Sequence, residues 1–345
     1  MSQRDNRNMK SIEVLDCTLR DGGYVNEWAF GFDIARAITE LVSYSGVKFV
    51  EVGFIGPHQD MEGVVRFSSM DELMKVFSNL DRNAKLSVMT YAEGYSADSF
   101  PDCSSDTTEM IRVIFWKRNL KEGVEYCRKL VKKGYQVGVQ LARTEQYDLS
   151  EIGDIVKMFN DVHPYAVYLV DSFGTFNREK MLRYAEIYDR NLALDIRFGF
   201  HAHNNLQQAF TNAVTFCEQD FEHDLILDAS VLGIGRGAGN LSIELFLNYL
   251  NQHGANYDLN PICKVANRYI EPIKKQIPES EIWGYSYPYF LAATTGRNHS
   301  IVNYLLEKKV DTEQMSRIFL RMKQDGTGIR FIKEEVDKYI TNTSK

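Results

Sequence analysis

The chain has 345 residues, 44% of them hydrophobic and 25% charged, so it can bury a large core as one big domain plus a smaller one. Its net charge of −7 argues against partners such as nucleic acid or an anionic membrane. No apolar run approaches the roughly 18 residues of a membrane-spanning helix. The polar residues 1–10 are expected to form a flexible leader. The 5 cysteines form no C-x-x-C pair, which predicts reduced thiols and a cytoplasmic location.

Short apolar, β-branched runs alternate with amphipathic stretches from residue 12 to about residue 252. Eight runs are predicted to be strands: Ile12–Leu15, Phe49–Phe54, Lys85–Tyr91, Ile111–Trp116, Gln136–Leu141, Ala166–Val170, Ile196–Phe200 and Leu225–Val231. Helices are predicted between and after them: Phe32–Ser45, Ser69–Leu80, Leu120–Lys133, Ile152–Asn160, Arg178–Arg190, Leu206–Cys217 and Leu241–Asn251. The polar stretch Ala92–Glu109 predicts a weak or short helix at the third crossover.

This alternation matches the size of a (β/α)8 TIM barrel, which we place at residues 11–258. The alternative is a doubly wound open sheet, but no convincing glycine-rich nucleotide loop follows the first strand. From about Pro261 only helical patterns remain, which predicts a small helical C-terminal domain over residues 259–345. Its expected helices are Ile262–Ile277, Pro288–Ala293, His299–Lys308, Thr312–Leu320 and Lys333–Ile340.

Two polar motifs follow predicted strands that are far apart in the sequence. Asp21 comes after the first strand, and His201 and His203 come after the seventh. Residues i and i+2 of a strand point to the same side, so the two imidazoles can bind one metal. The first, seventh and eighth strands are neighbours in a closed barrel, and the active site lies at their carboxyl ends. Asp21, both histidines and Asn240, which follows the eighth strand, are therefore expected to meet at a hard divalent ion.

Each of the other polar residues near the strand ends has a structural alternative. Arg20 with Asp21 could be an ion pair on the surface. Glu51 could be a buried carboxylate paired with Arg20 as readily as a catalytic base. Asp171 could cap the turn that follows it. The four glycines of the run Gly233–Asn240 could form a flexible loop, or could allow close approach of the backbone to an anionic substrate.

The segment Leu15–Gly22 resembles the D-x-T-L-R-D-G signature of the DRE-TIM metallolyase superfamily. His201–Asn204 looks like its H-x-H-N motif, Gly233–Asn240 its glycine loop, and Glu51–Gly53 its second-strand motif. Members of the superfamily make or break a carbon–carbon bond next to a carbonyl, through a metal-bound enolate. The resemblance implies that Asp21, His201 and His203 hold Mn²⁺ or Mg²⁺, with Zn²⁺ or Co²⁺ as alternatives. Asn240 would be a further ligand.

The resemblance also assigns roles around the substrate. Arg20 would stabilise the enolate oxygen, and Asp171 with Ser172 would help to hold the carboxylate of pyruvate. Gly235 lies in the glycine loop that approaches the substrate. The segment Gly284–Tyr287 resembles one that brings a tyrosine to the site, which makes Tyr285 and Tyr287 further candidates.

Among the branches of the superfamily, the 4-hydroxy-2-oxovalerate aldolases are most similar. They cleave a 4-hydroxy-2-keto acid to pyruvate and an aldehyde, but they carry a histidine, the expected base, where this chain has Tyr24. The base is therefore open between Tyr24, a metal-bound water, Glu51 and His58. An acyl-CoA-dependent Claisen synthase and a metal-binding protein with impaired catalysis are the alternative functions.

The resemblance implies a small 2-keto acid substrate, a homo-oligomer, and an acylating aldehyde dehydrogenase as a partner that receives the aldehyde. Nothing in the sequence identifies that aldehyde.

Overall fold

The computed structural model describes residues 11–278 and 283–343, so the predicted leader lies outside the described residues. Eight parallel strands form a closed barrel, because β1 pairs with both β9 and β2. They are β1 (Ile12–Asp16), β2 (Phe49–Ile55), β4 (Lys85–Tyr91), β5 (Met110–Phe115), β6 (Gln136–Leu141), β7 (Ala166–Asp171), β8 (Arg197–Ala202) and β9 (Leu225–Ala229). The two-residue β3 (Arg66–Phe67) pairs with β2 and was not predicted. The prediction of a TIM barrel is confirmed, and the open sheet is excluded.

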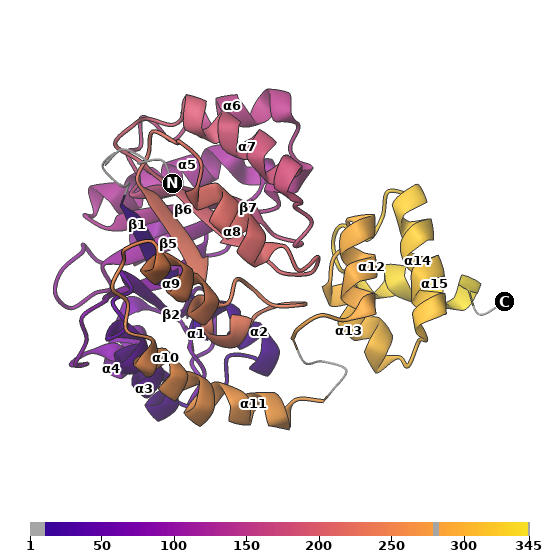
Figure 1. Ribbon diagram of the computed structural model, residues 1–345, viewed down its shortest axis with the longest axis horizontal. Coiled ribbons are helices and arrows are strands. Elements are labelled where there is room, and N and C mark those ends of the chain that lie inside the picture. Colours follow the sequence, from indigo (N-terminus) through magenta and orange to yellow (C-terminus); the bar gives the residue numbers. More distant parts are fainter. Residues whose placement is uncertain (1–10, 279–282, 344–345) are drawn as a thin grey trace, which may run out of the picture.

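Amphipathic helices surround the strands (Figure 1). They are α3 (Phe32–Ser43), α4 (Met70–Phe77), α5 (Leu120–Lys132), α6 (Leu149–Lys157), α7 (Arg178–Asn191), α8 (Ala209–Cys217) and α9 (Ile243–Gln252). In α5, for example, Val124, Cys127 and Leu130 recur at helical spacing and are buried in the barrel core. The polar third crossover contains only a short 3₁₀ turn, η1 (Ala97–Ser99), as its composition predicts.

The motif after β1 is helical. It forms two short helices, α1 (Thr18–Asp21) and α2 (Gly23–Asn26). Two glycines allow this close packing: a Cβ on Gly22 would lie 2.2 Å from the carbonyl oxygen of Thr18, and one on Gly23 would lie 2.0 Å from the ring of Trp28. Arg20 and Asp21 are thereby held on a rigid turn at the carboxyl end of β1.

The C-terminal part is helical, as predicted, but its first helices pack on the barrel. These are α10 (Leu259–Val265), the π-helical η5 (Ala266–Ile270) and α11 (Glu271–Gln276). Ile262, Val265 and Ile270 belong to the same apolar core as the barrel strands. The apolar core of the barrel therefore includes residues beyond the predicted boundary at residue 258, as far as Trp283.

The remaining helices form a second apolar cluster beside the barrel (Figure 1). They are α12 (Tyr287–Thr295), α13 (Ser300–Glu307), α14 (Thr312–Gln324) and α15 (Lys333–Thr343). In the described parts of the chain, no helix is long and apolar enough to cross a membrane.

Candidate active site

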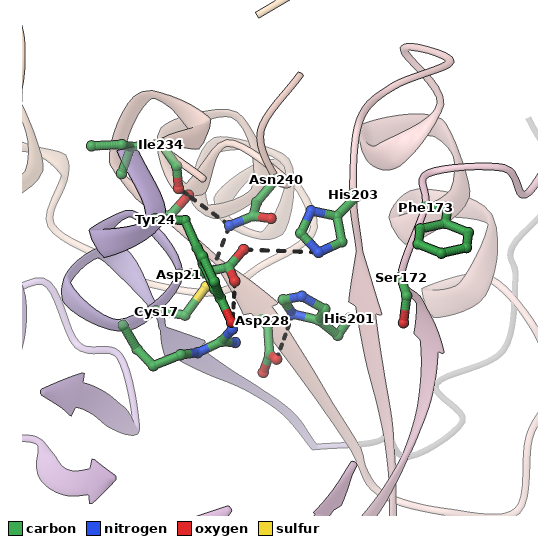
Figure 2. A network of polar contacts seen from close by, with 12 residues as sticks. Cys17, Asp21, Tyr24, Ser172, Phe173, His201, His203, Asp228, Ile234 and Asn240 are labelled. Atoms are coloured by element: carbon green, nitrogen blue, oxygen red, sulfur yellow. Dashed lines mark hydrogen bonds and ion pairs between the residues drawn. The ribbon is translucent and has the colours of Figure 1, made fainter. Parts of the chain in front are cut away.

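Three candidate metal ligands meet at the carboxyl ends of the barrel strands. Asp21 ends α1, His201 lies on β8, and His203 follows it. One ligand atom from each lies within 4.8 Å of the others, and all three residues are buried. Figure 2 shows their polar atoms turned toward one another. Oδ2 of Asp21 and Nδ1 of His203 are buried without a hydrogen-bond partner in the described residues, so the cradle has unused coordinating capacity.

The electrostatics suit a cation. Burial alone would raise the pKa of Asp21, but Arg20, His203 and His201 together hold it well below its ordinary value. Burial lowers the pKa of His203 to about 3, although Asp21 opposes the shift. The carboxylate is therefore ionised and the His203 imidazole neutral near pH 7, and these are the forms that bind metal.

Asp228 on β9 fixes the orientation of His201. Its Oδ2 lies 2.8 Å from Nδ1 of His201, so that a proton on Nδ1 leaves Nε2 as the coordinating atom. Burial raises the pKa of Asp228, but Arg112 and His201 outweigh burial and hold it below the ordinary value. Sequence reasoning missed Asp228; the signal was a single carboxylate inside an otherwise apolar strand.

Asn240, the predicted further ligand, lies beside His203. It forms an isolated antiparallel bridge with His203, and its Nδ2 donates to the carbonyl oxygen of Ile234 at 3.2 Å. Its Oδ1 is buried without a partner among the described residues. Gly235 contacts this amide: a Cβ at that position would lie 2.4 Å from Nδ2 of Asn240. Gly235 therefore makes room for Asn240, and it does not line the cavity in front of the ligands.

Arg20 is held rigidly beside the metal ligands. Its Nε donates to Oε2 of Glu51 at 2.7 Å, and its Nη1 pairs with Asp21. Burial would lower the pKa of Arg20, but Glu51 and Asp21 hold it well above its ordinary value. Arg20 also lines the cavity. It is thus a fixed cation that faces the place where a substrate would bind.

Arg112 connects Arg20 to His201 through the interior of the barrel. Its Nη1 donates to Glu51 at 2.8 Å, its Nη2 pairs with Asp228, and it stacks on the ring of Tyr168. We call the connected set Asp21, Arg20, Glu51, Arg112 and Asp228 the buried ion network. Arg112 was also missed, although a lone arginine in the apolar fourth strand was a visible signal.

The buried ion network holds Glu51, one of the proposed bases, away from the cavity. The side chain is fully buried between two arginines and does not line the cavity. Glu51 is therefore placed as a buried carboxylate paired with Arg20, which is one of the two interpretations that the sequence left open.

The cavity in front of the ligands has a volume of about 120 Å³. One wall is aromatic: Tyr91 stacks on Trp116, and its hydroxyl lies 3.2 Å from that of Tyr24. Arg236 of the glycine loop lies over the Tyr24 ring, 4.8 Å from its centroid. Ser172 lines the cavity and accepts a hydrogen bond from the backbone N–H of Arg143.

Several other candidates lie away from the cavity. Asp171 caps a turn: its two carboxyl oxygens accept from the N–H groups of Thr175 and Phe176 at 2.8 and 2.9 Å. Tyr285 and Tyr287 are 61% and 53% exposed and do not line it. His58 also lies outside its lining, where Nδ1 is hydrogen-bonded to Arg66.

The C-terminal part contributes two residues that the sequence did not indicate. Asn298 lines the cavity. His299 is buried, with its ring 6.2 Å from that of His203 and 6.1 Å from that of Phe173. Burial, together with Arg236 and His203, holds the pKa of His299 well below its ordinary value. In the sequence, Asn298 and His299 are marked only by their position in a short polar segment between two apolar helices.

The family model described as HMGL-like matches residues 11–268, about three quarters of the chain. The chain belongs to the HMGL-like family. This membership confirms the DRE-TIM metallolyase resemblance, and with the names of the relatives below it indicates a metal-dependent lyase of the aldolase type.

The chain is also similar to three named proteins. The chain is 28% identical over 258 residues to an oxaloacetate decarboxylase of Mycobacterium tuberculosis, covering 73% of this chain and 74% of the relative. It is 24% identical to a 4-hydroxy-2-oxovalerate aldolase of Geobacillus genomosp. 3, covering 76% and 78%. The N-terminal domain of a Bacteroides vulgatus protein provisionally named an aldolase superimposes with a TM-score of 0.71 at 25% identity, covering 85% of this chain and 96% of that domain.

Proposed function

We propose that the chain is a divalent-metal-dependent lyase that cleaves a 4-hydroxy-2-keto acid to pyruvate and an aldehyde. The observation that carries the proposal is the rigid Arg20 guanidinium beside a buried cradle of Asp21 and two histidines. Metal binding alone does not need this cation, whereas an enolate requires charge stabilisation. The relatives named 4-hydroxy-2-oxovalerate aldolase support the reaction.

The unpartnered oxygens of Asp21 and Asn240 fit a hard cation, and the two imidazoles complete the donor set. Asp21, His201 and His203 would hold Mn²⁺ or Mg²⁺, with Asn240 as a further ligand. Bound there, the ion supplies Lewis acidity next to the keto group.

Arg20 would stabilise the negative charge that develops on the keto oxygen as the carbon–carbon bond breaks. Glu51 and Asp21 already fix its position, so little reorganisation is needed during the reaction. The Ser172 hydroxyl can donate its proton to the substrate carboxylate.

Tyr24 would accept the proton of the 4-hydroxyl group. Its neighbour Tyr91 has a pKa raised far above the ordinary value, by burial and by Tyr24, so Tyr91 keeps its proton. The 3.2 Å contact between the two hydroxyls then lets Tyr91 donate a hydrogen bond to the oxygen of Tyr24, the atom that would take the proton.

The direct test is exchange of the methyl protons of pyruvate in D₂O with Mn²⁺ or Mg²⁺ present. We expect mass spectrometry to show incorporation of deuterium that depends on the metal, because cleavage passes through the enolate of pyruvate. Absence of exchange across metals and pH would contradict the proposal. Condensation of a 2-keto acid with acetyl-CoA would instead favour the Claisen alternative.

Replacement of Tyr24 with phenylalanine removes only the hydroxyl. We expect the rate of cleavage to fall by about 10²–10⁴-fold, the usual contribution of a general base. Exchange of pyruvate protons should persist, because that proton has a different acceptor. The matched control is Tyr44→Phe on an exposed tyrosine outside the cavity. Normal cleavage by the Tyr24 variant would exclude Tyr24 as the base.

A second candidate function is decarboxylation of oxaloacetate. Apart from the two proposed ligand histidines, no carboxylate or imidazole lines the cavity among the described residues. Loss of CO₂ needs no acceptor for a hydroxyl proton, and one relative is named oxaloacetate decarboxylase. In this case Tyr24→Phe should decarboxylate oxaloacetate at nearly the wild-type rate.

A further inference from the structure

A second cavity of about 250 Å³ adjoins the one in front of the metal ligands. The two share three lining residues, Trp116, Ala142 and Arg143, so they lie next to each other. Trp116 lines both cavities and stacks flat on Tyr91, which lines the first. An anion bound in the second cavity would therefore be the neighbour of a substrate held at the ligands.

The second cavity is lined by four cations and no carboxylate. They are Lys117, Arg118, Arg143 and Arg330. Lys117 is paired with Glu151 and Arg118 with Glu93. For Arg143 and Arg330, the described residues offer no ion pair and no hydrogen bond to the guanidinium. Two of the four positive charges therefore face the cavity without an anionic partner.

Among the described residues, Glu145 is the acid that interacts with Arg143, and it does little to balance this charge. Both of its carboxyl oxygens are buried without a hydrogen-bond partner among the described residues. Burial and Asp171 raise its pKa to about 8, so it is largely neutral at pH 7. A buried, uncharged carboxyl group leaves the cation beside it uncompensated.

Arg143 lies between the two cavities in an uncommon conformation. Its φ of 62° is in the left-handed region, which costs a non-glycine residue energy, and its N–H donates to Ser172 at 2.8 Å. Burial lowers the pKa of Arg143 despite Glu145, and the cations Arg236, Arg330 and Arg118 lower it further. A bound anion would relieve this mutual repulsion.

We propose that the second cavity is a distal anion subsite, and that the substrate is a 4-hydroxy-2-keto acid with a carboxylate or phosphate at its far end. This inference rests on the proposed lyase function. In cleavage the bond between C3 and C4 breaks, its electron pair passes into the enolate of pyruvate, and Tyr24 takes the proton of the 4-hydroxyl. C4 becomes the carbonyl carbon of an aldehyde that keeps the distal anion.

The same cations argue against a carboxylate that leaves as CO₂ in this subsite. A guanidinium paired with the departing carboxylate would stabilise the ground state more than the transition state, in which that charge is lost. The anion in the subsite must therefore be one that the product retains.

The test compares matched acceptor aldehydes in the condensation direction, with pyruvate and Mn²⁺. Succinic semialdehyde is compared with butanal, and glycolaldehyde phosphate with glycolaldehyde. We expect kcat/KM to be at least about tenfold higher for the anionic member of one pair, the scale of a hydrogen bond to a charged group. The pair that shows the preference distinguishes a carboxylate from a phosphate.

Two variants connect the preference to the subsite. Arg330→Gln and Arg143→Gln should each lower the anionic preference by roughly tenfold. The control is Arg268→Gln, the same change at an exposed arginine on η5 outside both cavities, which should keep the preference. Equal kcat/KM values within both aldehyde pairs in the wild type, or a preference unchanged in both variants, would overturn the inference.

A binding measurement separates this inference from the proposed function. Calorimetric titration of the metal-loaded protein with inorganic phosphate and with succinate should show binding that weakens in Arg143→Gln and Arg330→Gln. If the wild type fails to exchange pyruvate protons, the lyase function fails, but this titration still decides whether the anion site exists. Binding that is absent, or equal in the wild type and both variants, overturns the subsite.

Discussion

Replacement of Arg20 with lysine should lower turnover by about 100-fold or more, the scale for loss of one preorganised partner of an oxyanion. Lysine keeps the charge, but it is a point cation without the planar fork. It cannot bond to Glu51 and Asp21 and also face the substrate as Arg20 does. Metal affinity, measured by calorimetry, should change little, because the three proposed ligands remain.

The control for this experiment is Arg82→Lys. Arg82 donates from both Nη1 and Nη2 to Glu109 at 3.1 Å, so the change disturbs a comparable pair away from the cavity. Its turnover should equal that of the wild type. Normal turnover in Arg20→Lys on the true substrate would mean that Arg20 does not stabilise the enolate.

Replacement of Arg112 with leucine should lower the free energy of unfolding by about 3–5 kcal/mol, the usual cost of breaking a buried ion pair. Arg112 is fully buried, and its removal leaves Glu51 and Asp228 without their shared cation. Urea denaturation measures the change. The control, Lys129→Leu, removes a partly exposed lysine that pairs with Asp98, and should move the midpoint little.

A variant of Arg112 as stable as the wild type would show that the buried ion network does not hold the barrel interior together. Metal affinity provides a second readout, since Asp228 fixes the orientation of His201. We expect Arg112→Leu to weaken metal binding as well, because Asp228 would lose the cation that keeps it in place.

Much of the fold was predictable because its signals are local. Strand periodicity identified all eight barrel strands. His201 and His203 are two residues apart, so they point to the same side of their strand, and the first strand is close to that strand in a closed barrel. These two facts predicted that Asp21 meets both histidines. The helices after β1 were not predictable in this way. Their packing depends on contacts of Gly22 and Gly23 with Thr18 and Trp28, which no sequence period reports.

The remaining parts of the site depend on contacts between distant segments. Arg112 and Asp228 come from different strands and meet only inside the closed barrel. Asn298 and Arg330 reach the cavities from the C-terminal part, whose placement no pattern in the sequence gives. Tyr285 and Tyr287, for which a motif match predicts a site role, are exposed outside the cavity.

The buried ion network has a consequence for what the site attracts. Two arginines face three carboxylates in it, so its members together carry one excess negative charge in a region shielded from water. A divalent ion in the adjacent cradle would reverse the sign and leave one positive charge. The carboxylate of a 2-keto acid would then restore neutrality. The charge of the network therefore favours binding of the metal, and a bound metal would in turn strengthen the attraction for an anionic substrate.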